Sequence, residues 1–167
     1  SNVTVNGSGT TTFTGAVGAT NDLSSLTTDA TGDTQINGGS VDTTGTQTYN
    51  DDVTLGMNTV LTGTTISFGD TVDAATAATQ SLTITGDAVF GDSAGDVVGS
   101  NAELSSLAVT GTTTINGGNG SADSIRTDGN QDYGDDVILG RNTTLASESA
   151  GTINFDGDIN GDGTGPW

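Results

Sequence analysis

The sequence predicts an all-β protein that folds as a parallel β-helix, or β-solenoid, with about three short strands per coil. The composition favours strands and turns over helices, because the 167 residues include 33 Thr and 27 Gly but no Lys, two Glu and one Met. Short segments such as Val53-Thr54-Leu55 alternate apolar and polar residues, which indicates strands with one buried face. The sequence also repeats, and stacked repeats bury a continuous core that a single copy could not bury.

An internal repeat covers nearly the whole chain. The three strongest matches, separated by 81, 79 and 84 residues, are Leu23–Leu26 with Leu104–Leu107, Ile36–Gly39 with Ile115–Gly118, and Gly45–Thr59 with Gly129–Thr143. Ten of the fifteen positions in the last match are identical. Extending the alignment predicts two whole units, residues 1–80 and 81–167, in one continuous solenoid that a further unit could extend at either end.

Each unit contains about eleven short apolar segments, which lie too close together for helical crossovers. In the second unit these segments are 82–85, 88–90, 97–98, 104–109, 113–116, 124–127, 131–133, 137–139, 143–146, 152–155 and 158–160. With three strands per coil, a unit would form roughly four coils of ~20 residues, and the chain about eight coils. An antiparallel sandwich, with longer strands joined as hairpins, is the alternative fold.

The alternation also predicts the core, as a thin column of Val, Ile, Leu and Phe side chains. In the first unit the expected members are Val5, Phe13, Val17, Leu23, Leu26, Ile36, Val53, Leu55, Leu61, Ile66, Phe68 and Val72. Their counterparts in the second unit include Ile84, Leu104, Leu107, Ile115, Val137, Leu139, Leu145, Ile153, Phe155 and Ile159. Each side chain would contribute about 1.5–3 kcal/mol when fully buried.

The formal net charge of −19 and the missing residue types exclude several classes of function. A charge of this size repels nucleic acid and anionic lipid surfaces. Because Cys and His are absent, the chain has no disulfide framework, no thiol chemistry and no imidazole ligand or base. No apolar run approaches the ~20 residues of a membrane-spanning helix, so we expect no membrane insertion.

The repeat motifs xITGxxxF, LxSLxVTGTTTINGG, GxQxYxDDVxLGxNTxL and GTIxFxGDIxG resemble repeats in very large secreted bacterial adhesins. These are the filamentous-haemagglutinin-like exoproteins. The resemblance covers nearly all of the chain, but the secretion-signal domain of that family has no counterpart in it. The resemblance implies a right-handed parallel β-helix, an extracellular or cell-surface location on a bacterium, and a role as a stalk or surface fibre.

Two stretches rich in Gly and Asp are similar to calcium-binding loops. Residues 156–163 match the first half of an EF-hand loop, but Trp167 stands at position 12 and cannot bind calcium. Residues 117–125 come close to the calcium β-roll nonapeptide, but they have one residue too many and do not recur at nine-residue spacing. We therefore interpret both stretches as turns of the repeat.

The remaining candidates for chemistry are carboxylate pairs and two arginines. The pairs Asp51-Asp52 and Asp135-Asp136 occupy equivalent places in the two units, where an Asp-rich turn is the simplest interpretation and a cation or carbohydrate contact is the alternative. Two carboxylates suffice for an inverting glycoside hydrolase, and only Arg126 and Arg141 could act as the base of a lyase. An active site should interrupt the repeat, and no stretch does so. An ice-binding row would require one Thr-x-Thr pair in every coil, but the Thr-x-Thr pairs of this sequence follow no coil period. We predict no enzyme activity and no catalytic, cofactor-binding or metal-binding residues.

The predicted function is structural, as a module of a fibre or adhesin stalk that stacks end to end on further copies of itself or on adjacent repeats. Such a contact joins two different surfaces and does not close, so it builds a filament. The alternative is a calcium-dependent adhesion or carbohydrate-binding module. In that case Ca²⁺ bound to acidic turns would relieve the repulsion between coils ~5 Å apart.

Overall fold

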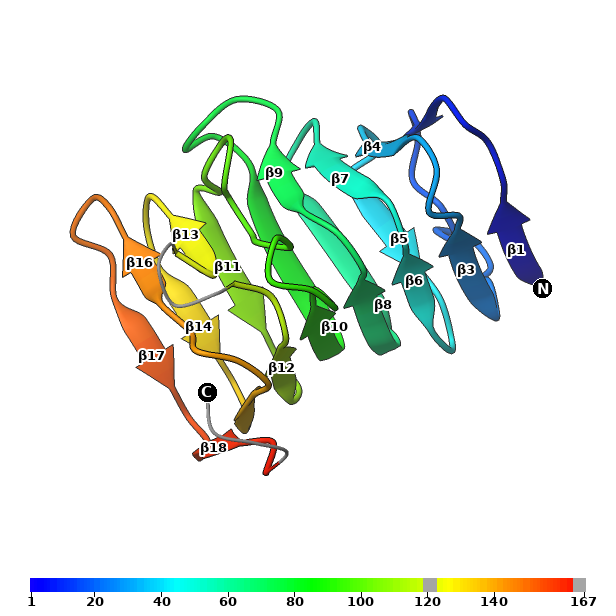
Figure 1. Ribbon diagram of the computed structural model, residues 1–167. Helices are drawn as coiled ribbons and strands as arrows, with labels where there is room; N and C mark the ends of the chain where they lie inside the picture. Colours follow the sequence, from blue (N-terminus) through cyan, green and yellow to red (C-terminus); the bar gives the residue numbers. More distant parts are fainter. Residues whose placement is uncertain (119–122, 164–167) are drawn as a thin grey trace.

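The computed structural model describes residues 1–118 and 123–163 and shows a parallel β-solenoid of about seven turns (Figure 1). The described residues form strands, turns and bends, with no helix. Each strand lies beside its counterpart in the next turn, and all pairings between named strands are parallel. The antiparallel sandwich is therefore wrong, and the parallel solenoid is confirmed.

The pairings divide the solenoid into three faces, which the chain visits in a fixed order. The first face holds β1 (Asn2–Val5), β3 (Ser25–Thr28), β6 (Gln47–Tyr49), the second half of β8 (Thr59–Phe68), the second half of β10 (Ser81–Phe90), β12 (Thr113–Ile115), β15 (Val137–Leu139) and β18 (Ile159–Gly161). The second face holds β2 (Thr10–Phe13), β4 (Asp33–Ile36), β7 (Asp52–Leu55), β9 (Val72–Ala74), the bridging residue Val98, β13 (Ile125–Thr127) and β16 (Leu145–Ser147). The third face holds the bridging residue Val17, β5 (Ser40–Asp42), the first halves of β8 and β10, β11 (Ser106–Val109), β14 (Gln131–Tyr133) and β17 (Ile153–Phe155).

The number of turns is about seven, and the expectation of about eight coils is wrong. Successive rungs of the first face lie from 19 residues apart, between Gln47 and Ile66, to 25 residues apart, between Ala88 and Thr113. The turns are thus slightly longer than the ~20 residues that the repeat length predicts. Eleven segments per unit also do not fill a whole number of three-sided turns, so rounding each unit up to four coils overcounts.

Two strands are longer than the sequence predicts. β8 and β10 each run for ten residues and continue around a corner of the solenoid from the third face to the first. Gly86 allows β10 to turn there, with a φ of 134° that side chains rarely adopt. A Cβ atom at Gly86 would also collide with the carbonyl oxygen of Gly63 on the turn below. The corner therefore keeps two segments in one strand, with a register shift between Thr85 and Asp87.

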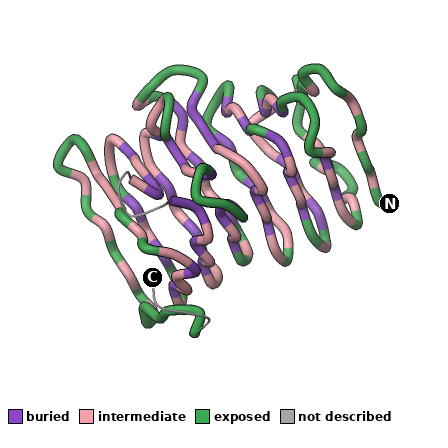
Figure 2. Tube along the Cα trace, viewed as in Figure 1, coloured by how far each residue is buried: buried purple, intermediate pink, exposed green. Residues whose placement is uncertain are grey.

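The core is a continuous column along the axis, and Figure 2 shows buried residues in the middle turns and exposed residues at the ends and corners. Most of the expected core residues are buried, and Val5, Phe13, Val17, Leu139, Leu145, Ile153 and Phe155 are partly buried at the two ends. Ile159 is 51% exposed, so its expected place in the core is wrong. It lies on the last described rung, where no further strand covers it. The core also holds residues outside the expected list, among them Val41, Tyr49, Leu82, Phe90, Ile125 and Tyr133.

Candidate functional site

The two units repeat in three dimensions down to individual hydrogen bonds. Tyr49 donates its hydroxyl to Gln47 Oε1 at 2.9 Å, and Tyr133 donates to Gln131 Oε1 at 3.0 Å. Gln47 Nε2 donates to the Val41 and Thr62 carbonyls, both at 2.9 Å. The equivalent Gln131 Nε2 donates to the Ile125 and Ala146 carbonyls at 3.4 and 2.7 Å. These two buried Gln–Tyr pairs satisfy polar groups inside the column, and they hold equivalent places in the two units.

Sequence reasoning based on apolar periodicity missed these four side chains. All four are fully buried, but two of them are Gln, which is mostly exposed in proteins. The signal that could have found them is the repeated spacing GxQxYxDDV, in which Gln and Tyr alternate like the apolar residues of a strand.

Burial raises the pKa of both Tyr49 and Tyr133, and the Asp51 carboxylate raises the pKa of Tyr49 further. These are the only tyrosines in the chain. The folded pKa lies above the unfolded value of about 10, so the free energy of unfolding should fall as the pH rises above 10. We expect no tyrosinate absorbance from the folded protein in this range, and its appearance only together with unfolding seen by circular dichroism. Titration of either tyrosine in the folded state near pH 10 would contradict this burial.

An aromatic column crosses the junction between the units. Tyr49 stacks on Phe68 with ring centroids 5.4 Å apart, and Phe68 stacks on Phe90 at 5.5 Å. The first two rings belong to the first unit and the third belongs to the second unit. Strands β8 and β10 form this junction over both halves of their length, and Phe68 and Phe90 are both buried there. The contact between units is therefore an ordinary rung contact of the solenoid, without a cap or a linker.

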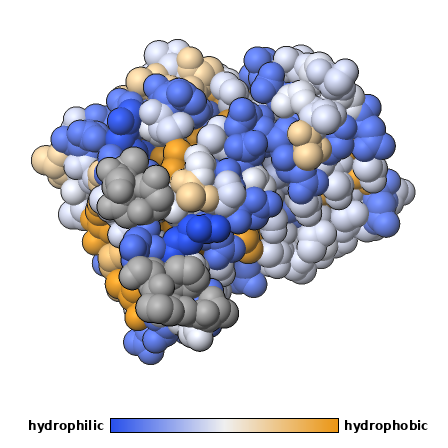
Figure 3. Space-filling view, in the orientation of Figure 1, coloured by the Kyte–Doolittle hydropathy of each residue, from blue (hydrophilic) through white to orange (hydrophobic). Residues whose placement is uncertain are grey.

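The C-terminal end of the described solenoid is equivalent to the end of the first unit at that junction. Among the described residues, however, no rung covers it. Tyr133 stacks on Phe155 at 5.1 Å, as Tyr49 stacks on Phe68, but no third ring follows among the described residues. Val72 is fully buried under Val98, whereas its equivalent Ile159 is 51% exposed. Figure 3 shows hydrophobic side chains gathered along the edge of the molecule where β17 lies. This end is therefore an open, partly apolar rung.

The N-terminal end repeats the other side of the junction. Val3 and Val5 correspond to Leu82 and Ile84, because Val5 pairs with Thr28 as Ile84 pairs with Val109. The members of this end that pack on the core are Val3, Val5, Phe13 and Val17, and all four are only partly buried. Their equivalents in the second unit, Leu82, Ile84, Phe90 and Val98, are all buried by the rung below them. Among residues 1–118 and 123–163, neither end thus has the covering rung that the internal junction supplies.

The two Asp pairs have equivalent sequences but different environments. Asp51 is buried and accepts hydrogen bonds from the hydroxyls of Thr28, at 2.7 Å, and Thr34, at 2.9 and 3.0 Å. Asp135 is exposed and accepts from the Asp136 backbone N–H at 2.8 Å. One of the two donors is missing in the second unit, because Thr28 corresponds to Val109, which cannot donate. The other donor, Thr34, corresponds to Thr113, whose buried hydroxyl has no hydrogen-bond partner among the described residues. Asp51 is thus a structural anchor, whereas Asp52 is exposed and the pair at 135–136 belongs to a surface turn.

We expect Asp51→Ala to lower the free energy of unfolding by about 2 kcal/mol, because it leaves two buried hydroxyls without an acceptor. Asp135→Ala is the matched control, and its effect should stay within about 0.5 kcal/mol, as at other exposed positions. Urea unfolding of the two variants at one pH measures both values. Equal effects would show that Asp51 is not a buried anchor.

Asp70 is partly buried and lies near other carboxylates. Partial burial and the neighbouring Asp52 carboxylate raise the pKa of Asp70. Among residues 1–118 and 123–163, no group of three or more Asp or Glu side chains is arranged to hold a metal ion. The EF-hand-like stretch forms the turn between β17 and β18, the whole of β18 and the two residues after it. Its position 12, Trp167, lies outside the described residues. Four residues of the β-roll-like stretch, 119–122, also lie outside them.

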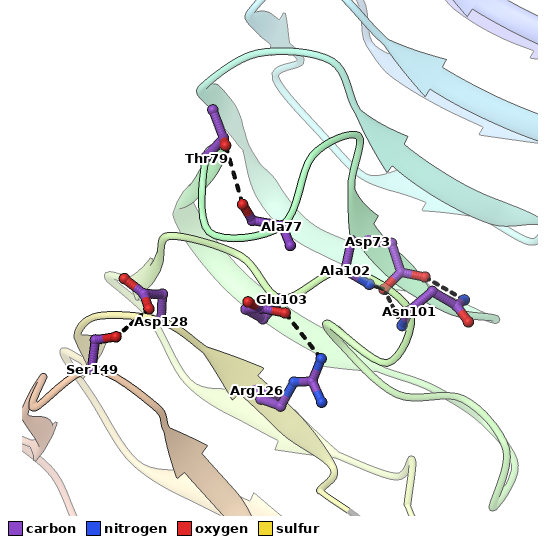
Figure 4. A network of polar contacts seen from close by, with 9 residues as sticks. All are labelled: Asp73, Ala77, Thr79, Asn101, Ala102, Glu103, Arg126, Asp128 and Ser149. Carbon is purple, nitrogen blue, oxygen red and sulfur yellow. Dashed lines mark hydrogen bonds and ion pairs between the residues drawn. The ribbon is translucent and has the colours of Figure 1, made fainter.

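Polar side chains also connect successive turns, as Figure 4 shows. Asp73 accepts hydrogen bonds from the Asn101 and Ala102 backbone N–H groups at 3.0 and 3.2 Å. Arg126 pairs with Glu103 at 3.0 Å across one turn. Arg126, one of the two candidate bases, thus forms an ion pair that connects neighbouring coils. The other candidate, Arg141, lies on a different turn, between β15 and β16.

Comparisons with protein-family models, with curated proteins and with solved structures found no match to this chain. The fold is that of β-helix repeat proteins in general. In the part of the chain that the structure describes, no helix is long and apolar enough to cross a membrane.

Proposed function

We propose that this chain is a structural module of a secreted or cell-surface bacterial fibre or adhesin stalk, in which units stack end to end into a filament. One observation carries the proposal: both ends expose apolar side chains whose equivalents are buried at the internal junction between units. An uncovered rung also presents unpaired backbone N–H and C=O groups, which pair readily with another strand. The resemblance of the repeat motifs to filamentous-haemagglutinin-like exoproteins supports the bacterial and extracellular setting.

A stalk role also agrees with the mechanics of the fold. Hydrogen bonds between turns run along the axis, and the apolar column continues through the junction between units. Tension along the fibre must therefore break many parallel contacts at each turn rather than a single hinge. The net charge of −19 makes the chains repel one another at low salt, both side by side and end to end. Because salt screens this repulsion, association at the ends should become stronger as ionic strength rises.

Sedimentation velocity of the isolated chain over a wide concentration range tests the proposal. We expect linear oligomers that grow with concentration. Ile159→Asp, on the open C-terminal rung, should weaken this association strongly. Met57→Asp is the matched control, because Met57 is 49% exposed but lies at a lateral corner of an inner turn, and association should persist. A strict monomer at high concentration, or equal effects of the two substitutions, would overturn the proposal.

A further inference from the structure

The repeat unit and the turn of the solenoid do not have the same length. The chain visits the three faces in order, and each unit supplies eleven strand segments. Eleven is not a multiple of three, so the second unit starts one face earlier than the first. The unit that starts with β1 on the first face is followed by a unit that starts with β10 on the third face.

Equivalent residues confirm that the second unit is turned as a whole. Tyr49 and Phe68 lie on the first face, but their equivalents Tyr133 and Phe155 lie on the third face. In the same way, β7 on the second face corresponds to β15 on the first face, and Leu61 on the third face corresponds to Leu145 on the second. The shift is one face at every position.

We infer that each unit added to the array docks with a rotation of one third of a turn about the solenoid axis. This inference rests on the proposed end-to-end assembly and specifies its geometry. The occupant of the open C-terminal rung is a second copy of this chain. Its β1 would lie on β16, its β2 on β17 and its Val17 segment on β18, as β10 and Val98 lie on β8 and β9 at the internal junction.

This docking supplies each missing contact of the open rung. Phe13 is the equivalent of Phe90, because Phe13 pairs with Ile36 as Phe90 pairs with Ile115. Phe13 of the incoming copy therefore meets Phe155 and completes the Tyr133–Phe155 stack. Val17 of the incoming copy covers Ile159, as Val98 covers Val72. Stacking the same faces without rotation would instead place Phe13 over β16, where no aromatic ring awaits it.

The rotation has a consequence for recognition. Equivalent corners of three successive units point to three different sides, so any binding feature of the repeat appears around the whole fibre. A partner that binds such a feature can then approach the fibre from any side. Equivalent features of successive units are separated by the length of one unit along the axis. The filament has no single functional face.

Engineered cysteines distinguish the three possible dockings, because the native chain contains no cysteine. Thr12→Cys on β2 is combined with one second substitution in each of three variants. The partner is Asn154→Cys on β17 for the inferred rotation, Ala146→Cys on β16 for no rotation, and Asn160→Cys on β18 for the opposite rotation. Strands in neighbouring rungs lie ~4.8 Å apart, within the reach of a disulfide bond.

Mild oxidation should produce a ladder of disulfide-linked multimers from the Thr12→Cys/Asn154→Cys chain on a non-reducing gel. We expect this ladder to form at least about tenfold faster than from the other two variants, because docking raises the effective concentration of the matched pair. Preferential cross-linking through Ala146→Cys or Asn160→Cys, or equal cross-linking of all three, overturns the inference. Those results leave the proposed function standing if the wild-type chain still associates, whereas a monomeric wild-type chain overturns the proposed function.

Discussion

Phe68→Ala should lower the free energy of unfolding by about 3–5 kcal/mol. Phe68 is 1% exposed and stands between two other rings, so its removal opens a cavity with ring faces above and below. The loss combines buried apolar area with two stacking contacts, each worth about 0.5–1.5 kcal/mol beyond the area. Each turn is stabilised by contacts with the neighbouring turns. The cavity should therefore also lower the cooperativity with which the two halves of the chain unfold. Urea unfolding at a concentration where the chain is monomeric measures the effect.

Phe155→Ala is the matched control for this prediction. Phe155 is the equivalent residue of the second unit, but it is only partly buried and stacks on one ring. Its truncation in the monomer should cost about half as much as that of Phe68. In the assembled filament the two positions become alike, so Phe155→Ala should also weaken association. A monomer in which both substitutions cost the same would contradict the open rung at the C-terminal end.

Gln47→Leu should lower the free energy of unfolding by about 3 kcal/mol, because it removes the hydrogen bonds of a buried side chain and leaves the buried Tyr49 hydroxyl without its acceptor. The side chain donates to the Val41 and Thr62 carbonyls and accepts the hydroxyl of Tyr49. Leucine fills a similar volume, so the loss reports on hydrogen bonds rather than on packing. Thermal and urea unfolding measure it, and Gln131→Leu in the second unit should produce a loss of the same kind.

A double-mutant cycle isolates the contact between Gln47 and Tyr49. Tyr49→Phe removes the hydroxyl whose acceptor is lost in Gln47→Leu, so the double variant should be more stable than the sum of the two losses predicts, by about 1 kcal/mol. Strict additivity would show that the buried pair contributes nothing as a pair.

The period-2 alternation and the internal repeat were enough to predict the parallel solenoid and nearly all of its strand positions. The segments 131–133 and 137–139 coincide with β14 and β15. The corners were less predictable, because β8 and β10 continue through residues that look like turns. At the corner of β10, Gly86 lies against the backbone of the turn below, and the sequence pattern does not reveal this close approach.

The sequence suggests the proposed end-to-end interface, whereas the proposed geometry of docking comes from the structure. The repeat suggested that the ends match, and the ends do expose the residues that the internal junction covers. The rotation between units was not apparent, because sequence alignment places equivalent residues in register without saying on which face each lies. The buried Asp51 was also missed, since its identity with Asp135 hides the replacement of Thr28 by Val109.

Electron cryomicroscopy of filaments assembled from this chain measures both the end-to-end stacking and the rotation between units. The 22 strand segments of the described residues occupy seven and one third turns, so we expect a rise of ~35 Å per chain at ~4.8 Å per turn. Each chain should also be rotated by about one third of a turn from its neighbour, beyond the gradual twist of the solenoid itself. A filament that repeats after a whole number of turns with like faces in line, or one built by lateral contacts, would contradict the account.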